Sequence, residues 1–219
     1  MQSPSVYIIG AQCTGKTTLF HVLQDVFSRE HPSLNLRVIS EVARNVLKKH
    51  HFSRDDIANN PHRSLELQQL ILGAQYDEEN KNPTEPVLSD RSGADPIVYG
   101  IKYGTVDARE ILESSPQWEC LRDRMREALV ILCPPVADWL KDDGVRLMAR
   151  TWTEWEDTHI AFLEVLEANG IPFHVIPPEV LDLGERVQFI LRLWHKLTGR
   201  NCPLSSAYMV KDDGILSEQ

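Results

Sequence analysis

Short apolar runs alternate with longer amphipathic stretches along this 219-residue chain. The apolar runs cover residues 6–10, 36–40, 86–90, 128–133 and 173–177, and they are typical of strands buried on both faces. The amphipathic stretches predict helices at about 17–29, 41–50, 62–80, 107–127, 136–142, 152–169 and 179–198. Strands separated by helices indicate an α/β fold, with a parallel sheet covered by helices on both faces.

The residues directly after each strand are the first place to look for chemistry, because parallel sheets bind ligands beyond the carboxyl ends of their strands. After the first strand comes G-x-x-x-x-G-K-[ST], with Gly10, Gly15, Lys16 and Thr17 at the fixed positions. Backbone N–H groups of such a loop point at phosphate oxygens, the lysine reaches the β- and γ-phosphates, and the threonine coordinates Mg²⁺. The strand–loop–helix order favours this nucleotide site over a simple glycine-rich turn. The predicted nucleotide-binding residues are Gly10, Ala11, Gln12, Cys13, Thr14, Gly15, Lys16, Thr17 and Thr18.

The second strand is followed by SEVARN, which places Glu41 at the carboxyl end of the strand and Arg44 three residues later. This spacing puts both side chains on one helix face, aimed at one ligand or at each other. In the first interpretation, Glu41 accepts the proton of a substrate hydroxyl or holds that hydroxyl in line with the γ-phosphate, and Arg44 binds substrate. In the second, Glu41 is an acid favoured at a helix start and Arg44 is its salt-bridge partner. The position at the ligand-binding edge favours the first.

The third strand ends in VLSDRSGADP, which supplies three charged candidates. An acid that closes an apolar strand is what a P-loop protein needs to hold the Mg²⁺ shell, so Asp90 and Thr17 are the predicted metal ligands, with a turn-forming Asp90 as the alternative. We expect the adjacent Arg91 to neutralise the transferring phosphoryl group or to hold the acceptor. Asp95 either caps the next helix or binds substrate hydroxyls, and both interpretations stay open.

Two tyrosines, Tyr99 and Tyr103, lie four residues apart on a short helix expected after the third strand. Stacked aromatic rings near an acceptor site would grip a flat ring such as a nucleobase or a pyridine. Packing in the core is the alternative interpretation.

The segment WLKDDGVRLMARTWTEWE, between the fourth and fifth strands, is rich in charges and in tryptophan. Arg146 and Arg150 would project together from a helix, as a lid requires if it is to bring cations to the phosphates and exclude water; Lys141 is a weaker third candidate. A solvated helix with i, i+4 ion pairs is the alternative. Three tryptophans are predicted to pack this segment against the body: Trp139, Trp152 and Trp155.

Composition narrows the class of protein further. A net charge of −9 argues against broad binding to nucleic acid or to anionic membranes. No apolar run reaches the length of a membrane span and no signal peptide is recognisable, so we expect a cytoplasmic protein. The four scattered cysteines indicate neither a zinc site nor a disulfide framework.

We expect one domain over residues 1–199, with a lid at about 138–157 and a tail at 200–219; the sequence carries no signal for an oligomeric state.

The segments GAQCTGKTTL, SEVARNVL, LQQLILGAQ, LSDRSGADPIVYG and DDGVR, taken in order, resemble the NadR-like P-loop kinase family over roughly residues 6–178. The resemblance implies a nucleoside-kinase-like three-layer sandwich with a five-stranded parallel sheet and a helical lid. It also implies a Mg·ATP site on residues 10–18 and an acceptor site near Glu41 and Asp90. The sequence shows neither the adenylyltransferase domain nor the DNA-binding helix-turn-helix that accompany the kinase part of NadR, so a stand-alone kinase with another small acceptor stays open.

Two functions from different classes follow from these motifs. The first is phosphoryl transfer from Mg·ATP to a hydroxyl of a nucleoside-like metabolite, with nicotinamide riboside as one candidate; the predicted lid favours it. The second is an NTP-hydrolysing regulatory switch without a small-molecule acceptor, binding ATP or GTP. The segment NKNP at 80–83 only approximates the guanine motif N-K-x-D, which favours adenine. The predicted catalytic residues are Lys16, Glu41, Asp90, Arg91, Arg146 and Arg150, and the predicted substrate-binding residues are Glu41, Arg44, Asp90, Arg91, Asp95, Tyr99 and Tyr103.

Overall fold

The computed structural model describes residues 3–136, 139 and 151–199. Within them, five strands form one parallel sheet, as expected, and their order is β2-β3-β1-β4-β5. The strands are β1 Val6–Ile9, β2 Arg37–Ile39, β3 Val87–Asp90, β4 Leu129–Leu132 and β5 His174–Val175. Most of the expected helix at 136–142, most of the lid and the tail at 200–219 lie outside the described residues.

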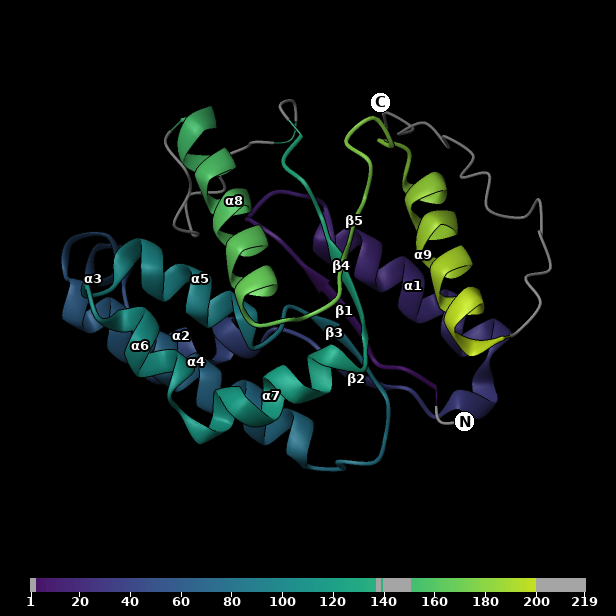
Figure 1. Cartoon of the computed structure of the whole chain (residues 1–219), viewed down its shortest axis with the longest axis horizontal. Helices are drawn as coiled ribbons and strands as arrows, with labels where there is room; N and C mark the ends of the chain where they lie inside the picture. The colour runs from purple at the N-terminus through teal and green to yellow at the C-terminus, as the bar shows by residue number, and fades with distance from the viewer. Residues whose placement is uncertain (1–2, 137–138, 140–150, 200–219) are drawn as a thin grey trace, which may run out of the picture.

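Helices cover both faces of the sheet, which confirms the predicted three-layer sandwich (Figure 1). The helices are α1 Lys16–Glu30, α2 Val42–Lys49, α3 Arg54–Asn59, α4 Pro61–Asn80, α5 Ala94–Tyr103, α6 Ala108–Glu113, α7 Pro116–Arg126, α8 Trp152–Ala168 and α9 Leu183–Thr198, with a short 3₁₀ turn at Pro32–Leu34. On one face, Ile8 and Ile131 pack against α1 and α9. On the other, Tyr7 and Val130 pack against the layer formed by α4, α5, α7 and α8. Because successive residues of a strand face opposite sides, apolar runs are needed to fill both layers.

The pairing of the central strand fixes the position of the functional edge. β1 is hydrogen-bonded to β3 on one side and to β4 on the other, with Ile8 opposite Asp90 in the first pair. The loop after β1 and the last residue of β3 therefore emerge side by side from the carboxyl edge of the sheet. This register brings together two segments that are about eighty residues apart in sequence.

Two helices differ from the sequence prediction, and both differences have a local cause. The single helix expected at 107–127 is two helices, α6 and α7, because Pro116 begins a new helix and the Ser115 hydroxyl accepts a hydrogen bond from Trp118 N–H at 3.2 Å. The helix α3 was not predicted, although its capping box was readable: Ser53 and Asp56 exchange hydrogen bonds at its start.

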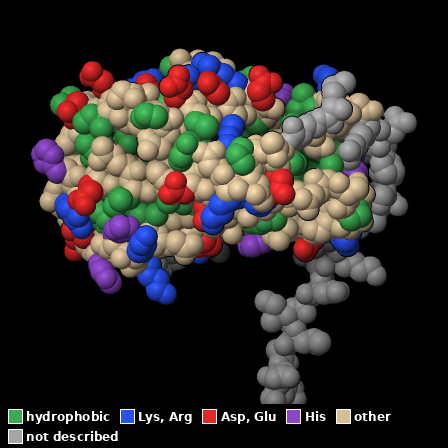
Figure 2. Space-filling model, turned by 90° about the horizontal axis from the view of Figure 1, so that it is seen from below, with side chains coloured by type: hydrophobic (Ala, Val, Ile, Leu, Met, Phe, Trp, Pro, Cys, Tyr) green, Lys and Arg blue, Asp and Glu red, His purple; other side chains and the backbone are tan. Residues whose placement is uncertain are grey.

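The charges on the surface and the length and apolarity of the helices can be compared with the sequence-based expectations on nucleic acids and membranes. On the face shown in Figure 2, Lys and Arg side chains are interspersed with Asp and Glu. Among the described residues, no helix is both long enough and apolar enough to cross a membrane.

Close packing at the end of α5 generates a test of the fold. A Cβ atom on Gly104 would lie 2.5 Å from the Gly100 carbonyl oxygen, which belongs to the backbone and cannot move aside easily. We expect Gly104→Ala to lower the free energy of unfolding by about 1–3 kcal/mol. Gly73, inside α4, has no atom within 4 Å of an added Cβ, so Gly73→Ala should raise stability by about 0.5–1 kcal/mol. Urea unfolding of both variants measures this; equal effects would contradict the packing described for α5.

Candidate active site

The loop between β1 and α1 has the backbone that a phosphate site needs. Gly10 and Gly15 have φ values of 135° and 76°, which L side chains rarely adopt. A Cβ on Gly10 would lie 2.5 Å from the Cys133 carbonyl oxygen, and one on Gly15 would lie 2.8 Å from Nη1 of Arg186. Helix α1 starts at Lys16, so the positive end of its dipole lies at this loop.

Lys16 folds back over the loop. Its ammonium donates hydrogen bonds to the Ala11 carbonyl oxygen and, at 3.2 Å, to the Thr14 hydroxyl, and the residue is only 5% exposed. Burial, followed by the nearby positive charge of Arg91, lowers the pKa of Lys16 to about 8. Asp90 and Asp95 oppose this shift, and the negative charge of a bound polyphosphate would oppose it further, because it favours the protonated ammonium.

Thr17 and Asp90 meet at the point where the β1–β3 register predicts. The Thr17 hydroxyl donates to Oδ2 of Asp90 at 2.8 Å, while Oδ1 of Asp90 is buried without a hydrogen-bond partner among the described residues. A hydroxyl beside a carboxylate with an unsatisfied oxygen fits Mg²⁺, which usually takes one or two protein ligands together with phosphate oxygens and water. In the described parts of the chain, groups of three or more His, Cys, Asp or Glu side chains that could hold a metal ion are absent.

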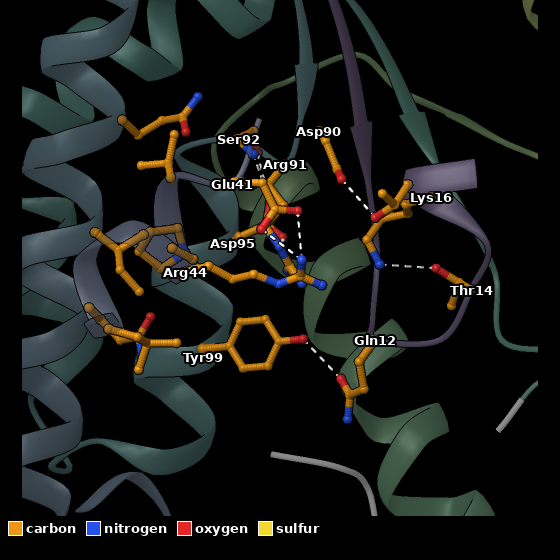
Figure 3. Close-up of a pocket in the computed structure, with 18 of the residues that line it drawn as sticks. Gln12, Thr14, Lys16, Glu41, Arg44, Asp90, Arg91, Ser92, Asp95 and Tyr99 are labelled. Carbon is orange, nitrogen blue, oxygen red and sulfur yellow. Dashed lines mark hydrogen bonds and ion pairs between the residues drawn. The ribbon is translucent and has the colours of Figure 1, made fainter. Parts of the chain in front are cut away.

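Arg91 and Asp95 follow Asp90 in the chain and form an ion pair, in which the Asp95 side chain is buried and the Arg91 side chain is 30% exposed. Nη1 of Arg91 donates to Oδ1 of Asp95 at 3.0 Å, and Oδ2 of Asp95 accepts the Ser92 backbone N–H at 2.9 Å. Burial raises the pKa of Asp95, and the charge of Arg91 opposes that shift. Asp95 thus accepts a local backbone hydrogen bond at the start of α5, in line with the capping interpretation, and it also pairs with Arg91 (Figure 3). The binding of substrate hydroxyls by Asp95 stays a prediction.

Glu41 and Arg44 lie together at the second strand end. Their side chains form an ion pair of 2.7 Å and are 38% and 53% exposed. Glu41 is in the left-handed region, with φ 59°, and makes no side-chain capping bond to α2. The salt bridge of the second interpretation is therefore present, and Glu41 lies at the start of α2, where the helix dipole favours an acid. Both residues line the same cavity as Lys16 and Asp90.

The two tyrosines take different positions. Their rings stack with centroids 6.3 Å apart and planes 14° apart. Tyr99 lines the cavity and donates its hydroxyl to Oε1 of Gln12 at 2.9 Å (Figure 3). Tyr103 lies behind it, with its hydroxyl 3.4 Å from a carboxylate oxygen of Glu154. The structure thus places Tyr99 at the site and Tyr103 as its support.

One cavity of about 690 Å³ is lined by residues from all of these segments, among them Lys16, Glu41, Asp90 and Tyr99. Its first part lies at the phosphate loop, along residues 12–18, and its rim carries Glu41 and Arg44. Its second part was not predicted: it lies under α2, α3 and α4, and its apolar wall consists of Leu47, Phe52, Ile57, Leu67 and Ile71. The segment LELQQLILGAQ carried a signal for this part, because Gln68 and Gln75 are seven residues apart on an otherwise apolar helix face.

Two side chains from distant segments hold the phosphate loop from outside, and the sequence did not assign either to the site. Arg186, 2% exposed, donates to the Thr14 carbonyl oxygen at 3.1 Å, and its guanidinium lies 4.8 Å from the ring centroid of Trp139. Trp155 is fully buried and donates from Nε1 to the Gln12 carbonyl oxygen at 2.7 Å, consistent with the packing predicted for it. The predicted lid cations Lys141, Arg146 and Arg150 lie outside the described residues.

Solved structures of P-loop kinases share this fold. The crystal structure of NadR protein in complex with NR matches with a TM-score of 0.69 at 23% identity, covering 93% of this chain and 54% of that one. NadR in complex with NAD and AMP-PNP gives 0.67 at 21% identity, covering 94% and 52%. Thymidylate kinase from Ehrlichia chaffeensis gives 0.60 at 15% identity, covering 88% and 98%. The chain therefore spans about half the length of the NadR chains it matches.

The sequence itself identifies the family. No protein of curated function matches the chain significantly. A family model described as "AAA domain" (AAA_28) matches residues 5–186, which include all five described strands, the phosphate loop and Arg186. The chain belongs to this AAA domain family, and its fold is that of the NadR-like P-loop kinases.

Proposed function

We propose that the protein transfers the γ-phosphoryl group of Mg·ATP to a hydroxyl of a small nucleoside-like metabolite, with nicotinamide riboside as the first acceptor to test. The observation that carries the proposal is the shape of the cavity. It continues from the phosphate loop past Glu41 into the apolar part under α2, α3 and α4. A hydrolase or a switch needs only the phosphate half, whereas a kinase needs room for a second molecule beside it.

The phosphate half supplies charge and orientation. The backbone of residues 12–18 and the ammonium of Lys16 would bind the β- and γ-phosphates, and Arg91 approaches from β3. Thr17 and Asp90 would hold Mg²⁺, which neutralises phosphate charge when bound. Such sites accelerate transfer mainly by positioning the reactants and stabilising charge.

Glu41 is the residue that we assign to the acceptor. In the transfer, the acceptor oxygen bonds to the γ-phosphorus, the bond from that phosphorus to the bridging oxygen breaks, and ADP leaves. The hydroxyl proton passes to a carboxylate. Asp90 already accepts a hydrogen bond from the Thr17 hydroxyl, whereas Glu41 lies at the boundary between the two halves of the cavity and is paired with Arg44. The left-handed backbone conformation of Glu41 directs its carboxylate to this boundary, and this conformation lowers the free energy of unfolding by about 1–3 kcal/mol.

The structure also bears on the guanine-binding alternative. The segment at 80–83, which approximates N-K-x-D, begins at the last residue of α4 and precedes the start of β3. It therefore lies at the amino edge of the sheet, opposite the phosphate loop. Its Asn80 side chain accepts a hydrogen bond from Arg124, and Lys81 pairs with Glu78. This placement supports ATP over GTP as the donor.

The direct test is product analysis. Purified protein is incubated with Mg·ATP and single nucleosides, including nicotinamide riboside, and the products are identified by mass spectrometry. We expect one nucleoside to gain a phosphoryl group while ADP appears in equal amount, and Lys16→Ala to abolish this product without unfolding the protein. Release of free phosphate that no nucleoside alters would instead support the hydrolase or switch.

Replacing Glu41 separates its proposed role from a structural one. Glu41→Gln keeps the size and polarity of the side chain but removes the proton acceptor, so turnover should fall by about 10²–10⁴-fold. ATP affinity should change little, because Glu41 is assigned to the acceptor. Glu66→Gln is the matched control: Glu66 is also exposed and also paired with an arginine, Arg63, but lies outside the cavity lining. An equal loss of ATP affinity and turnover in Glu41→Gln would make Glu41 structural.

The pKa of Lys16 predicts how ATP binding depends on pH. The protonated ammonium binds phosphate, and in the free protein its pKa is about 8. The association constant should therefore be insensitive to this group below pH 8 and should fall by up to about tenfold per pH unit above it. Titration with a fluorescent ATP analogue between pH 6.5 and 9.5 measures the profile. Lys16→Ala should bind weakly and without this dependence; a decline that persists in Lys16→Ala would come from another group.

A further inference from the structure

Arg186 is a buried positive charge to which the described part of the chain supplies no carboxylate partner. The residue lies in the first turn of α9, is 2% exposed, and has a buried Nε without a hydrogen-bond partner. Burial lowers the pKa of the Arg186 guanidinium, and the nearby Cys133 thiol opposes this shift only in part. The other cations of the phosphate half, Lys16 and Arg91, both lie near the carboxylate of Asp95. Because an unpaired charge in a protein interior is costly, its presence here points to a counter-charge that comes from outside the chain.

The contacts of Arg186 place its charge directly behind the phosphate loop. Its Nη1 donates to the Thr14 carbonyl oxygen at 3.1 Å and lies 2.8 Å from the position of a Cβ on Gly15. The guanidinium also lies 4.8 Å from the ring centroid of Trp139, which lines the cavity. Arg186 itself is not part of the cavity lining, so it would act on a bound phosphate through the loop and not by direct contact.

The hydrogen bond to Thr14 changes the donor strength of the next residue. The Thr14 carbonyl and the Gly15 N–H belong to one peptide group, and a cation that donates to the oxygen polarises the whole group, which makes the N–H a stronger donor. The N–H groups of such a loop are the ones that face phosphate oxygens. The Gln12 carbonyl provides a comparison within the same loop: it accepts a hydrogen bond from the neutral indole N–H of Trp155 at 2.7 Å, which braces the loop without adding charge.

We propose that Arg186 is a positioning residue for the donor polyphosphate: it strengthens the Gly15 N–H through the Thr14–Gly15 peptide group, and the bound polyphosphate is its counter-charge. This inference rests on the nucleotide half of the proposed function and does not depend on the acceptor. It has a consequence that a purely structural brace lacks. The free protein contains a buried charge whose partner arrives only with the nucleotide, so Arg186 contributes to nucleotide affinity and not to the stability of the free protein.

Three variants of the full chain separate the charge from the bracing contact. Arg186→Met keeps an unbranched side chain and removes the charge, Arg186→Lys keeps a positive charge, and Arg192→Met removes a charge from an exposed position on the same helix. The probes are a non-hydrolysable ATP analogue with Mg²⁺ and inorganic tripolyphosphate, which has neither base nor ribose. Calorimetric titration gives the affinities, and thermal unfolding with and without the ATP analogue gives the stability of each variant.

We expect Arg186→Met to bind both probes about 10- to 100-fold more weakly than the wild type, and to unfold, without ligand, at a temperature no lower than the wild type. Arg186→Lys should recover most of the lost affinity, and Arg192→Met should behave as the wild type.

Three results would overturn the assignment. The first is unchanged affinity in Arg186→Met. The second is a lower unfolding temperature of free Arg186→Met together with a loss of affinity that Arg186→Lys does not recover, which would make Arg186 a structural brace. The third is a wild type that binds neither probe. A wild type that binds both probes with the expected dependence on Arg186, but phosphorylates no nucleoside, would support this inference and overturn the kinase proposal instead.

Discussion

The parallel pairing of β1 with β3 is the constraint on which the site depends. Because Ile8 lies opposite Asp90, the phosphate loop and the end of β3 leave the sheet next to each other, and the Thr17 hydroxyl reaches Asp90 at 2.8 Å. A shift of the register by one residue would turn Asp90 toward the other face of the sheet and separate these groups. The buried apolar side chains on both faces of β1 oppose such a shift, so the core that stabilises the fold also sets the geometry of the site.

Strained backbone is concentrated around the cavity. Five described non-glycine residues have positive φ, and three of them, Cys13, Glu41 and Arg91, line the cavity. Each such conformation costs of the order of 1–3 kcal/mol and persists only where the surroundings enforce it. The positive φ of Arg91 is maintained by the ion pair with Asp95 and by the hydrogen bond that the backbone N–H of Arg91 donates to the Ile8 carbonyl oxygen. These three residues follow β1, β2 and β3. Their strained backbone is consistent with side chains that are oriented toward a ligand, although a relaxed backbone would orient them differently.

The sequence predicted what local patterns determine. The apolar runs located the five described strands, and the phosphate-loop motif located the half of the cavity that we propose binds the nucleotide, with Asp90 at its edge. The half that we propose binds the acceptor was missed, because it is formed by packing between α2, α3, α4 and α5, and no single segment shows which face of each helix is shared. Arg186 was missed for the same reason: it contacts Thr14 from 172 residues away, and nothing near it in sequence indicates a phosphate loop. Gln68 looked like an ordinary polar residue until the structure showed it buried.

The central claim is that one cavity holds a phosphoryl donor and its acceptor side by side. The most direct measurement is a calorimetric titration of nicotinamide riboside into protein that is already saturated with Mg²⁺ and a non-hydrolysable ATP analogue. The account predicts that one riboside binds per chain in the presence of the nucleotide, with an affinity that is no weaker than for the nucleotide-free protein. Competition, in which the nucleotide expels the riboside, would show that the two occupy the same part of the cavity and would contradict the account.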